Sequence, residues 1–275
     1  MKVPDQVRKT VAFVTYKNQQ TGQLTPVGSV FFIGPDPPQG MDNSQRVYAV
    51  TARHVVDGLK MLGVEDTHLR LNLHKGGLTK TTVPLKNWFV HPRDASLDVA
   101  IVEHGIPAEA DHLLVPYSME ITPERMQEHE VALGDEVFVS GLFHHHMGEN
   151  RNIPVVRIGN LAALAEEKVN TSMGPMDAYL IEARSIGGIS GSPVFLNLGI
   201  NRIIGGEYKQ VKGHDPVFFL FGLIHGHFES KLPDENGLVK ESLNAGIAIV
   251  VPMASVHGVI AEYEKLYPVS GRQPA

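Results

Sequence analysis

The sequence of 275 residues contains no cysteine. Disulfide bonds, a thiolate nucleophile and zinc sites with cysteine ligands are therefore excluded. A chain of this length can bury a substantial core without such cross-links, in one large domain or two small ones.

Basic residues are not in excess, because 24 Lys and Arg stand against 30 Asp and Glu, for a net charge of −6. Nucleic acid is therefore not an expected partner. The sequence also lacks an apolar run long enough to span a membrane, and its N-terminus lacks the apolar segment of a signal peptide. We expect no membrane partner and a cytoplasmic location for this chain, or a secreted one if a leader was removed.

Turn-forming residues are frequent, with 27 glycines and 18 prolines. They separate short apolar or alternating runs, the pattern of many short strands. Long helical patterns do not alternate with these runs, which disfavours a parallel α/β sheet. We expect strands at residues 11–14, 27–33, 47–51, 69–73, 97–102, 136–139, 154–158, 178–181, 193–195, 203–204, 217–224 and 246–251.

The strand pattern divides the chain into two halves, residues 8–118 and 131–253, joined by a segment with weak strand signals. Thr122 and Pro123 are typical of the start of a short helix in that segment. The polar segment 225–245 is expected to be a mobile loop. After Pro252, apolar residues recur at helical spacing, which predicts an amphipathic C-terminal helix over residues 254–268.

Three short motifs carry residues suited to nucleophilic catalysis: Thr51-Ala52-Arg53-His54, Asp98-Val99-Ala100-Ile101 and Gly188-Ile189-Ser190-Gly191-Ser192-Pro193. Serine needs a base to remove its proton, and the imidazole of His54 can act as that base. A carboxylate such as Asp98 can orient the imidazole and stabilise its cation. Asp98 lies within the strand expected at 97–102, among apolar residues, so we expect it to be buried with a partner.

In this order, the motifs TARH, DVAI and GISGSP resemble those of the chymotrypsin-like (trypsin-fold) serine peptidases, especially their cysteine-free bacterial members. The order His, Asp, Ser and the serine at position 192 both argue against an α/β-hydrolase. The resemblance implies an all-β fold of two six-stranded antiparallel β-barrels with a C-terminal helix. The first barrel would carry His54 and Asp98, and the second Ser190.

The resemblance also implies a serine endopeptidase that acts on protein or peptide substrates through an acyl-enzyme and needs no cofactor. The backbone N–H groups of Gly188 and Ser190 would form the oxyanion hole. A substrate peptide would pair with the strand around His225, Gly226 and His227, and Gly246 would line the specificity pocket.

Two positions depart from the digestive members of the family. Ile189 replaces the aspartate that receives the new N-terminus after zymogen cleavage, so that activation cannot operate here. Arg184 would lie at the pocket base, and with His225 or His227 it would favour an acidic substrate side chain. Nothing in the sequence explains Arg53, which precedes the histidine.

Two alternatives remain open. The same fold could be latent, active only with a partner protein or trigger, or serve as a binding module. Among the 14 histidines, His225 and His227 could share a strand face and hold zinc, but no third ligand is evident. We therefore expect no metal site. The run His144-His145-His146 is expected in an exposed loop.

Overall fold

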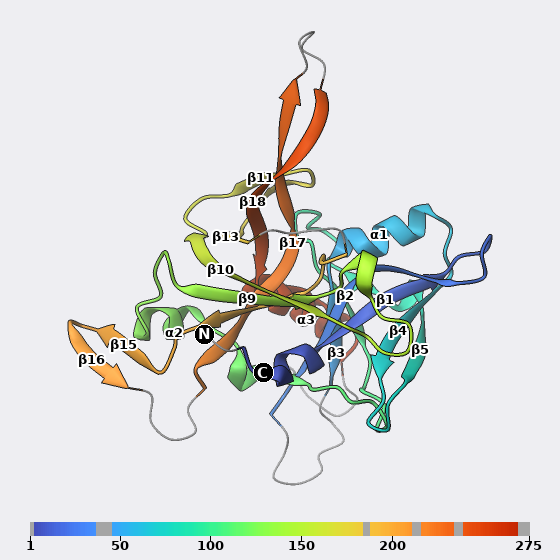
Figure 1. Cartoon of the computed structure of the whole chain (residues 1–275), viewed down its shortest axis with the longest axis horizontal. Coiled ribbons are helices and arrows are strands. Elements are labelled where there is room, and N and C mark those ends of the chain that lie inside the picture. The colour runs from blue at the N-terminus through green and yellow to red at the C-terminus, as the bar shows by residue number, and fades with distance from the viewer. Residues whose placement is uncertain (1–2, 37–45, 184–187, 211–215, 234–238, 269–275) are drawn as a thin grey trace.

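The computed structural model describes residues 3–36, 46–183, 188–210, 216–233 and 239–268. Strands dominate, and they form two units that follow one another along the chain (Figure 1).

The first unit is a strongly curled sheet with the strand order β5-β4-β1-β2-β3-β7-β6, with β8 paired in parallel to β2. A six-stranded antiparallel barrel was expected here. The all-β fold class is confirmed, and the curled sheet has two more strands than expected. The additional strands β6 and β8 are two-residue segments that extend the sheet, and no pairing closes its two ends within the described residues. The strands are β1 (Val11–Lys17), β2 (Leu24–Gly34), β3 (Tyr48–Thr51), β4 (Asp66–Asn72), β5 (Leu78–Pro84), β6 (Phe89–Val90), β7 (Ala100–Glu103) and β8 (Val115–Pro116).

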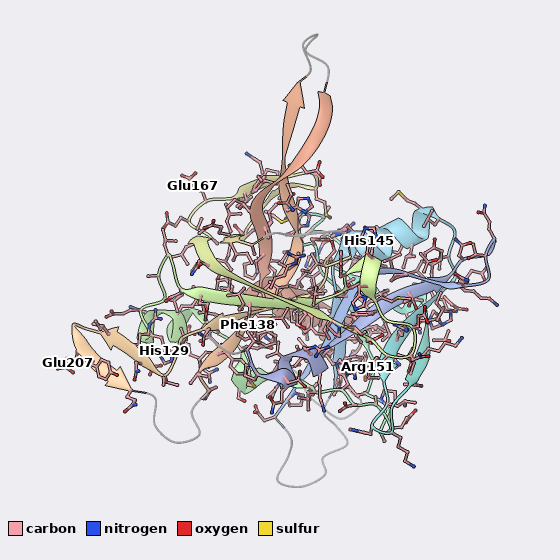
Figure 2. The ribbon with its side chains drawn as sticks, in the orientation of Figure 1. His129, Phe138, His145, Arg151, Glu167 and Glu207 are labelled. Atoms are coloured by element: carbon pink, nitrogen blue, oxygen red, sulfur yellow. The ribbon has the colours of Figure 1, made fainter. Side chains whose placement is uncertain are left out.

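The second unit is a closed six-stranded antiparallel barrel, as expected, with the order β10-β13-β18-β17-β14-β9. Its interior is lined by Val137, Val139, Val194 and Leu196. On the other face of the same strands, Phe138 of β9 stacks on Phe195 of β14 with ring centroids 5.3 Å apart, and both rings belong to the core shared with the first unit; Figure 2 shows Phe138 near the centre of the molecule. The barrel strands are β9 (Glu136–Gly141), β10 (Val155–Ala163), β13 (Tyr179–Glu182), β14 (Pro193–Asn197), β17 (Phe218–Pro233) and β18 (Val239–Pro252).

Strands β17 and β18 continue beyond the barrel as a hairpin arm that projects from the body of the molecule (Figure 1). The expectation of a loop over 225–245 is therefore wrong for most of that segment, and residues 234–238 lie outside the described part. Two smaller hairpins also leave the barrel: β11 (Val169–Thr171) with β12 (Gly174–Met176), and β15 (Asn201–Ile204) with β16 (Glu207–Gln210). Glu207 marks β16 at the periphery in Figure 2.

Three α-helices complete the described part: α1 (Arg53–Met61), α2 (Pro123–Glu128) and α3 (Met253–Leu266). Helix α1 was not expected. Helix α2 begins as expected, since the Thr122 hydroxyl accepts a hydrogen bond from the Arg125 N–H at 3.3 Å. Short 3-10 helices cover Asp5–Lys9, Leu85–Asn87, Tyr117–Met119 and His144–His146.

Helix α3 confirms the predicted amphipathic helix and joins the C-terminus to the first unit. Its buried side chains Val256, Val259 and Ile260 belong to the same apolar core as strands β1 to β4. The Tyr48 hydroxyl donates to Glu264 Oε1 at 2.7 Å, so β3 and α3 are also joined by a partly buried polar contact. None of the helices in these described ranges is long and apolar enough to cross a membrane.

Candidate active site

His54 and Asp98 meet at one end of the first unit. His54 is the second residue of α1, which begins immediately after β3 and Ala52. Asp98 precedes β7 by two residues, so the expectation that it lies inside a strand is wrong. Arg53, unexplained by the sequence, pairs with Asp57 one turn further along α1, Nε to Oδ2 at 2.9 Å.

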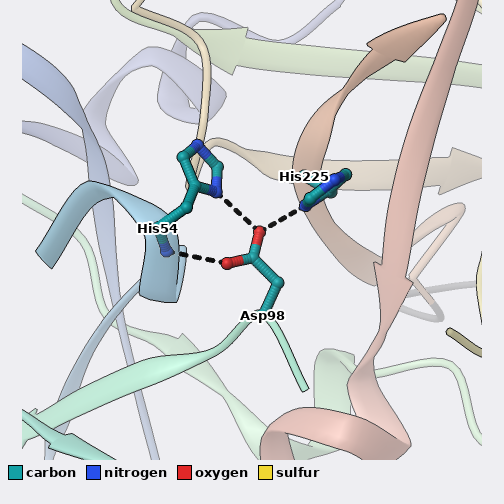
Figure 3. A group of neighbouring side chains, drawn as sticks. All are labelled: His54, Asp98 and His225. Carbon is teal, nitrogen blue, oxygen red and sulfur yellow. Dashed lines mark hydrogen bonds and ion pairs between the residues drawn. The ribbon is translucent and has the colours of Figure 1, made fainter. Parts of the chain in front are cut away.

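Two groups of His54 hold the Asp98 carboxylate. The backbone N–H of His54 donates to Asp98 Oδ1 at 2.8 Å, and the ring Nδ1 lies 2.8 Å from Oδ2 (Figure 3). Because a carboxylate only accepts, Nδ1 carries a proton, and in the neutral ring Nε2 keeps its lone pair. His54 therefore has the tautomer that a general base requires.

A second imidazole contacts the same carboxylate from the other unit. His225 of β17 places its Nδ1 2.5 Å from Asp98 Oδ2, and the His54 and His225 rings meet edge to face with centroids 5.4 Å apart (Figure 3). Asp98 is completely buried and His225 is 8% exposed.

Asp98 is buried with partners, as the sequence indicated. Burial alone would raise the pKa of Asp98, but hydrogen bonds from His225 and His54 outweigh burial. Its pKa therefore lies well below the usual value, and the carboxylate is ionised at neutral pH.

Ser190 occupies a tight turn that enters β14. The turn is closed by a hydrogen bond from the Ser192 N–H to the Ile189 carbonyl oxygen at 3.0 Å. Gly188 and Gly191 flank Ser190 with φ of +98° and +78°, a backbone conformation that glycine adopts without strain. The Ser190 hydroxyl donates to the His225 carbonyl oxygen at 3.3 Å, and among the described residues it has no hydrogen bond to His54.

The serine turn is docked directly on the first unit. The Ser29 N–H of β2 donates to the Ser190 carbonyl oxygen at 2.9 Å. A Cβ on Gly191 would lie 2.4 Å from both the Ser29 carbonyl oxygen and the Thr51 hydroxyl, so only glycine fits there. The close approach of the two units thus fixes Ser190 beside the strand that leads to His54.

The expected oxyanion donors lie in this same turn. Within the described parts of the chain, no group accepts a hydrogen bond from the N–H of Gly188 or of Ser190. The His144 ring packs against Gly188, since a Cβ there would lie 2.3 Å from His144 Cδ2.

The expected substrate-binding residues lie along β17 and β18. Strand β17 pairs with β18 along one edge and with β14 along the other, but the pairing with β14 ends at Leu223. In the described residues, the edge of β17 that faces away from β18 therefore has no strand partner from His225 to Phe228. His227 lies opposite Ala248, and its ring is 3.8 Å from Glu229. Gly246 borders a cavity of about 510 Å³ with Glu182 and Asn160. Arg184 lies outside the described residues.

His54, Asp98 and His225 are also a possible metal ligand set by residue type, since their ligand atoms lie within 4.8 Å of one another. Tetrahedral zinc with bonds near 2.0–2.1 Å would separate its ligand atoms by about 3.3 Å. The two N–O separations of 2.8 and 2.5 Å are shorter. These distances are those of hydrogen bonds, not of metal ligands.

Two contacts of the site were missed by sequence reasoning. His225 was assigned to the substrate edge, but its ring contacts Asp98. Ser29 was not singled out at all, although it contacts Gly188 as well as Ser190. Both contacts join residues far apart in the chain, and no local pattern signals them.

No protein-family model matches the chain, and no curated protein matches it in sequence. Its structure is similar to that of the MamO protease domain from Magnetospirillum magneticum, with a TM-score of 0.52 and 15% identity, over 92% of this chain and 97% of that one. It is also similar to Deg5, with a TM-score of 0.50 and 14% identity, over 95% and 91% of the two chains. The fold is chymotrypsin-like, as expected.

Proposed function

We propose that the protein is a serine endopeptidase in which Ser190 is the nucleophile, His54 the general base and Asp98 the residue that orients His54. The observation that carries this proposal is the buried, ionised Asp98, which accepts hydrogen bonds from both the backbone N–H and the Nδ1 of His54. Burying a charge costs free energy unless the charge is hydrogen-bonded. Here the hydrogen bonds that offset this cost also fix the tautomer of His54 that catalysis needs.

The reaction follows from these positions. The Ser190 hydroxyl turns from the His225 carbonyl toward His54 Nε2, which takes its proton as the oxygen attacks the substrate carbonyl. The N–H groups of Gly188 and Ser190 stabilise the resulting oxyanion. His54 then returns the proton to the leaving amine, and water hydrolyses the acyl-enzyme by the same route.

The substrate is an extended peptide that pairs with the open edge of β17. This pairing would place the scissile bond beside Ser190, because the carbonyl of His225 in the same edge contacts the serine hydroxyl. The preference for an acidic side chain at the pocket, proposed from Arg184 and the two histidines, now depends on Arg184 and His227. The His225 ring is occupied by Asp98.

A latent peptidase is the second candidate, and one contact favours it. The Ser190 hydroxyl donates a hydrogen bond to the His225 carbonyl oxygen in this structure. An activating partner would have to turn this hydroxyl toward His54. A binding module on the same fold would use the edge of β17 alone.

Labelling with a fluorophosphonate probe tests the proposal, because the probe reacts much faster with an activated serine than with an ordinary one. We expect one added probe by intact mass, located at Ser190 by peptide mapping, and no labelling of Ser190→Ala or His54→Ala. Both variants must retain the wild-type circular dichroism spectrum. A folded wild-type protein that does not react would overturn the proposal of an active enzyme and favour the latent form or the binding module.

A further inference from the structure

A single oxygen of the Asp98 carboxylate, Oδ2, contacts the rings of two histidines. His54 Nδ1 and His225 Nδ1 lie 2.8 and 2.5 Å from Oδ2, and Oδ1 is held by the His54 backbone. An ionised carboxylate only accepts hydrogen bonds, so each Nδ1 carries a proton. The protonation site still open on His225 is therefore its Nε2, as it is on His54.

The charges of this group differ between its protonation states. With both rings neutral, the group carries −1, and the proton that His54 takes from Ser190 brings the total to zero. If His225 is already protonated, the same step produces two cations around one carboxylate. At the observed 5.4 Å between ring centroids and an effective dielectric constant of about 20, that repulsion would slow the step on the order of a hundredfold.

We infer that His225 is a positioning residue that holds Asp98 and, through its own protonation, controls how readily His54 accepts the serine proton. This inference rests on the proposed function and deepens it. Bound neutral, His225 fixes Asp98 from the second unit and thereby joins the two units at the catalytic carboxylate. When His225 is a cation, its charge makes His54 a weaker base.

Among the residues that the structure describes, few other charges that could take over this role surround His225. On its own strand, His227 follows two residues later and lies near Glu229. From α1 and from the segment before β7, the groups that face it are His54 and Asp98. From the serine turn it is met by the neutral Ser190 hydroxyl, and the neighbouring residue Gly226 pairs with the apolar Ile249 of β18.

The test is the pH dependence of the rate at which a fluorophosphonate labels Ser190, which needs no known substrate. Two coupled imidazoles should give wild-type protein two apparent ionisations on the acid side of the profile. The variant His225→Asn places an amide N–H where Nδ1 lies, so it keeps a donor for Asp98 but does not titrate, and its profile should show one ionisation. His225→Ala also loses the donor, so its rate at neutral pH should fall roughly 10- to 100-fold. His68→Asn is the matched control: His68 of β4 contacts the Thr82 hydroxyl through its Nδ1, and the substitution should leave the profile unchanged.

A second measurement does not depend on activity. In proton NMR spectra of protein labelled with ¹⁵N-histidine, two downfield Nδ1–H resonances are expected, one lost in His54→Ala and the other in His225→Asn. If labelling of Ser190 persists, a single ionisation in the wild type, or an unchanged profile in His225→Asn, would overturn the inference. Absence of labelling in wild type would instead refute the proposed function, and the two resonances would still report the contact.

Discussion

His112 shows how one residue can set the response of the fold to acid. Its ring meets Phe32 edge to face at 4.9 Å, and its Nε2 is shielded from solvent with no hydrogen-bond partner among the described residues. Burial lowers the pKa of His112 to about 3, although the nearby Asp111 opposes the shift. The folded protein therefore holds this imidazole neutral at pH values where the unfolded chain binds a proton.

We predict that His112 makes the protein less stable as the pH falls from about 6.5 toward 3. In that window the unfolded state binds one more proton than the folded state, so protonation favours unfolding. Between pH 7 and 5 the wild type should lose about 2 kcal/mol more unfolding free energy than His112→Leu. Urea denaturation of both proteins at the two pH values measures this difference, and equal losses would refute the assignment.

The residue types correctly predicted the burial of one site residue, but the local sequence did not predict its place relative to the strand. An aspartate among apolar neighbours had to be buried with a partner, and Asp98 is. Its placement within a strand was wrong, because Val99 packs inside the unit before β7 begins at Ala100. Alternation of apolar residues cannot distinguish a buried loop from a buried strand.

The structural elements were most predictable where one face is buried. Helix α3 was expected at 254–268 and spans Met253–Leu266, because its apolar residues recur at helical spacing and contact one core. The arm of β17 and β18 was missed because the segment has no apolar alternation. A two-stranded ribbon outside the barrel needs none to form its backbone hydrogen bonds.

We predict that helix α3 stabilises the fold through its buried face. Ile260 is 5% exposed and packs in the core shared with the first unit, so Ile260→Ala should lower the unfolding free energy by about 3 kcal/mol. Lys265→Ala, at an exposed position of the same helix, should change it by less than about 0.5 kcal/mol. Chemical denaturation measures both. If Ile260→Ala lowered the unfolding free energy as little as Lys265→Ala, α3 would contribute little to the stability of the core.

At the scale of the whole molecule, the fold class followed from motif order and strand pattern, but the contact between the two units did not. Ser29 lies in β2 and is fully buried. It donates its N–H to the Ser190 carbonyl, its hydroxyl lies 3.3 Å from the Gly188 carbonyl, and that hydroxyl accepts the Leu142 N–H at 2.9 Å. Such a contact depends on how two folded units meet, and neither local propensity nor spacing encodes it.

The serine turn should therefore lose its shape when the Ser29 hydroxyl is removed. In Ser29→Ala the buried Leu142 N–H and Gly188 carbonyl lose a partner, at a cost of about 1–3 kcal/mol in unfolding free energy. Because Gly188 is an oxyanion donor in the proposed mechanism, the rate of probe labelling at Ser190 should fall at least tenfold. Ser140→Ala is the matched control. The Ser140 hydroxyl is equally buried but has no hydrogen-bond partner among the described residues, so its loss should leave both quantities nearly unchanged. If Ser29→Ala loses stability but labels at the wild-type rate, the two units would be joined at Ser29 without the junction shaping the oxyanion turn.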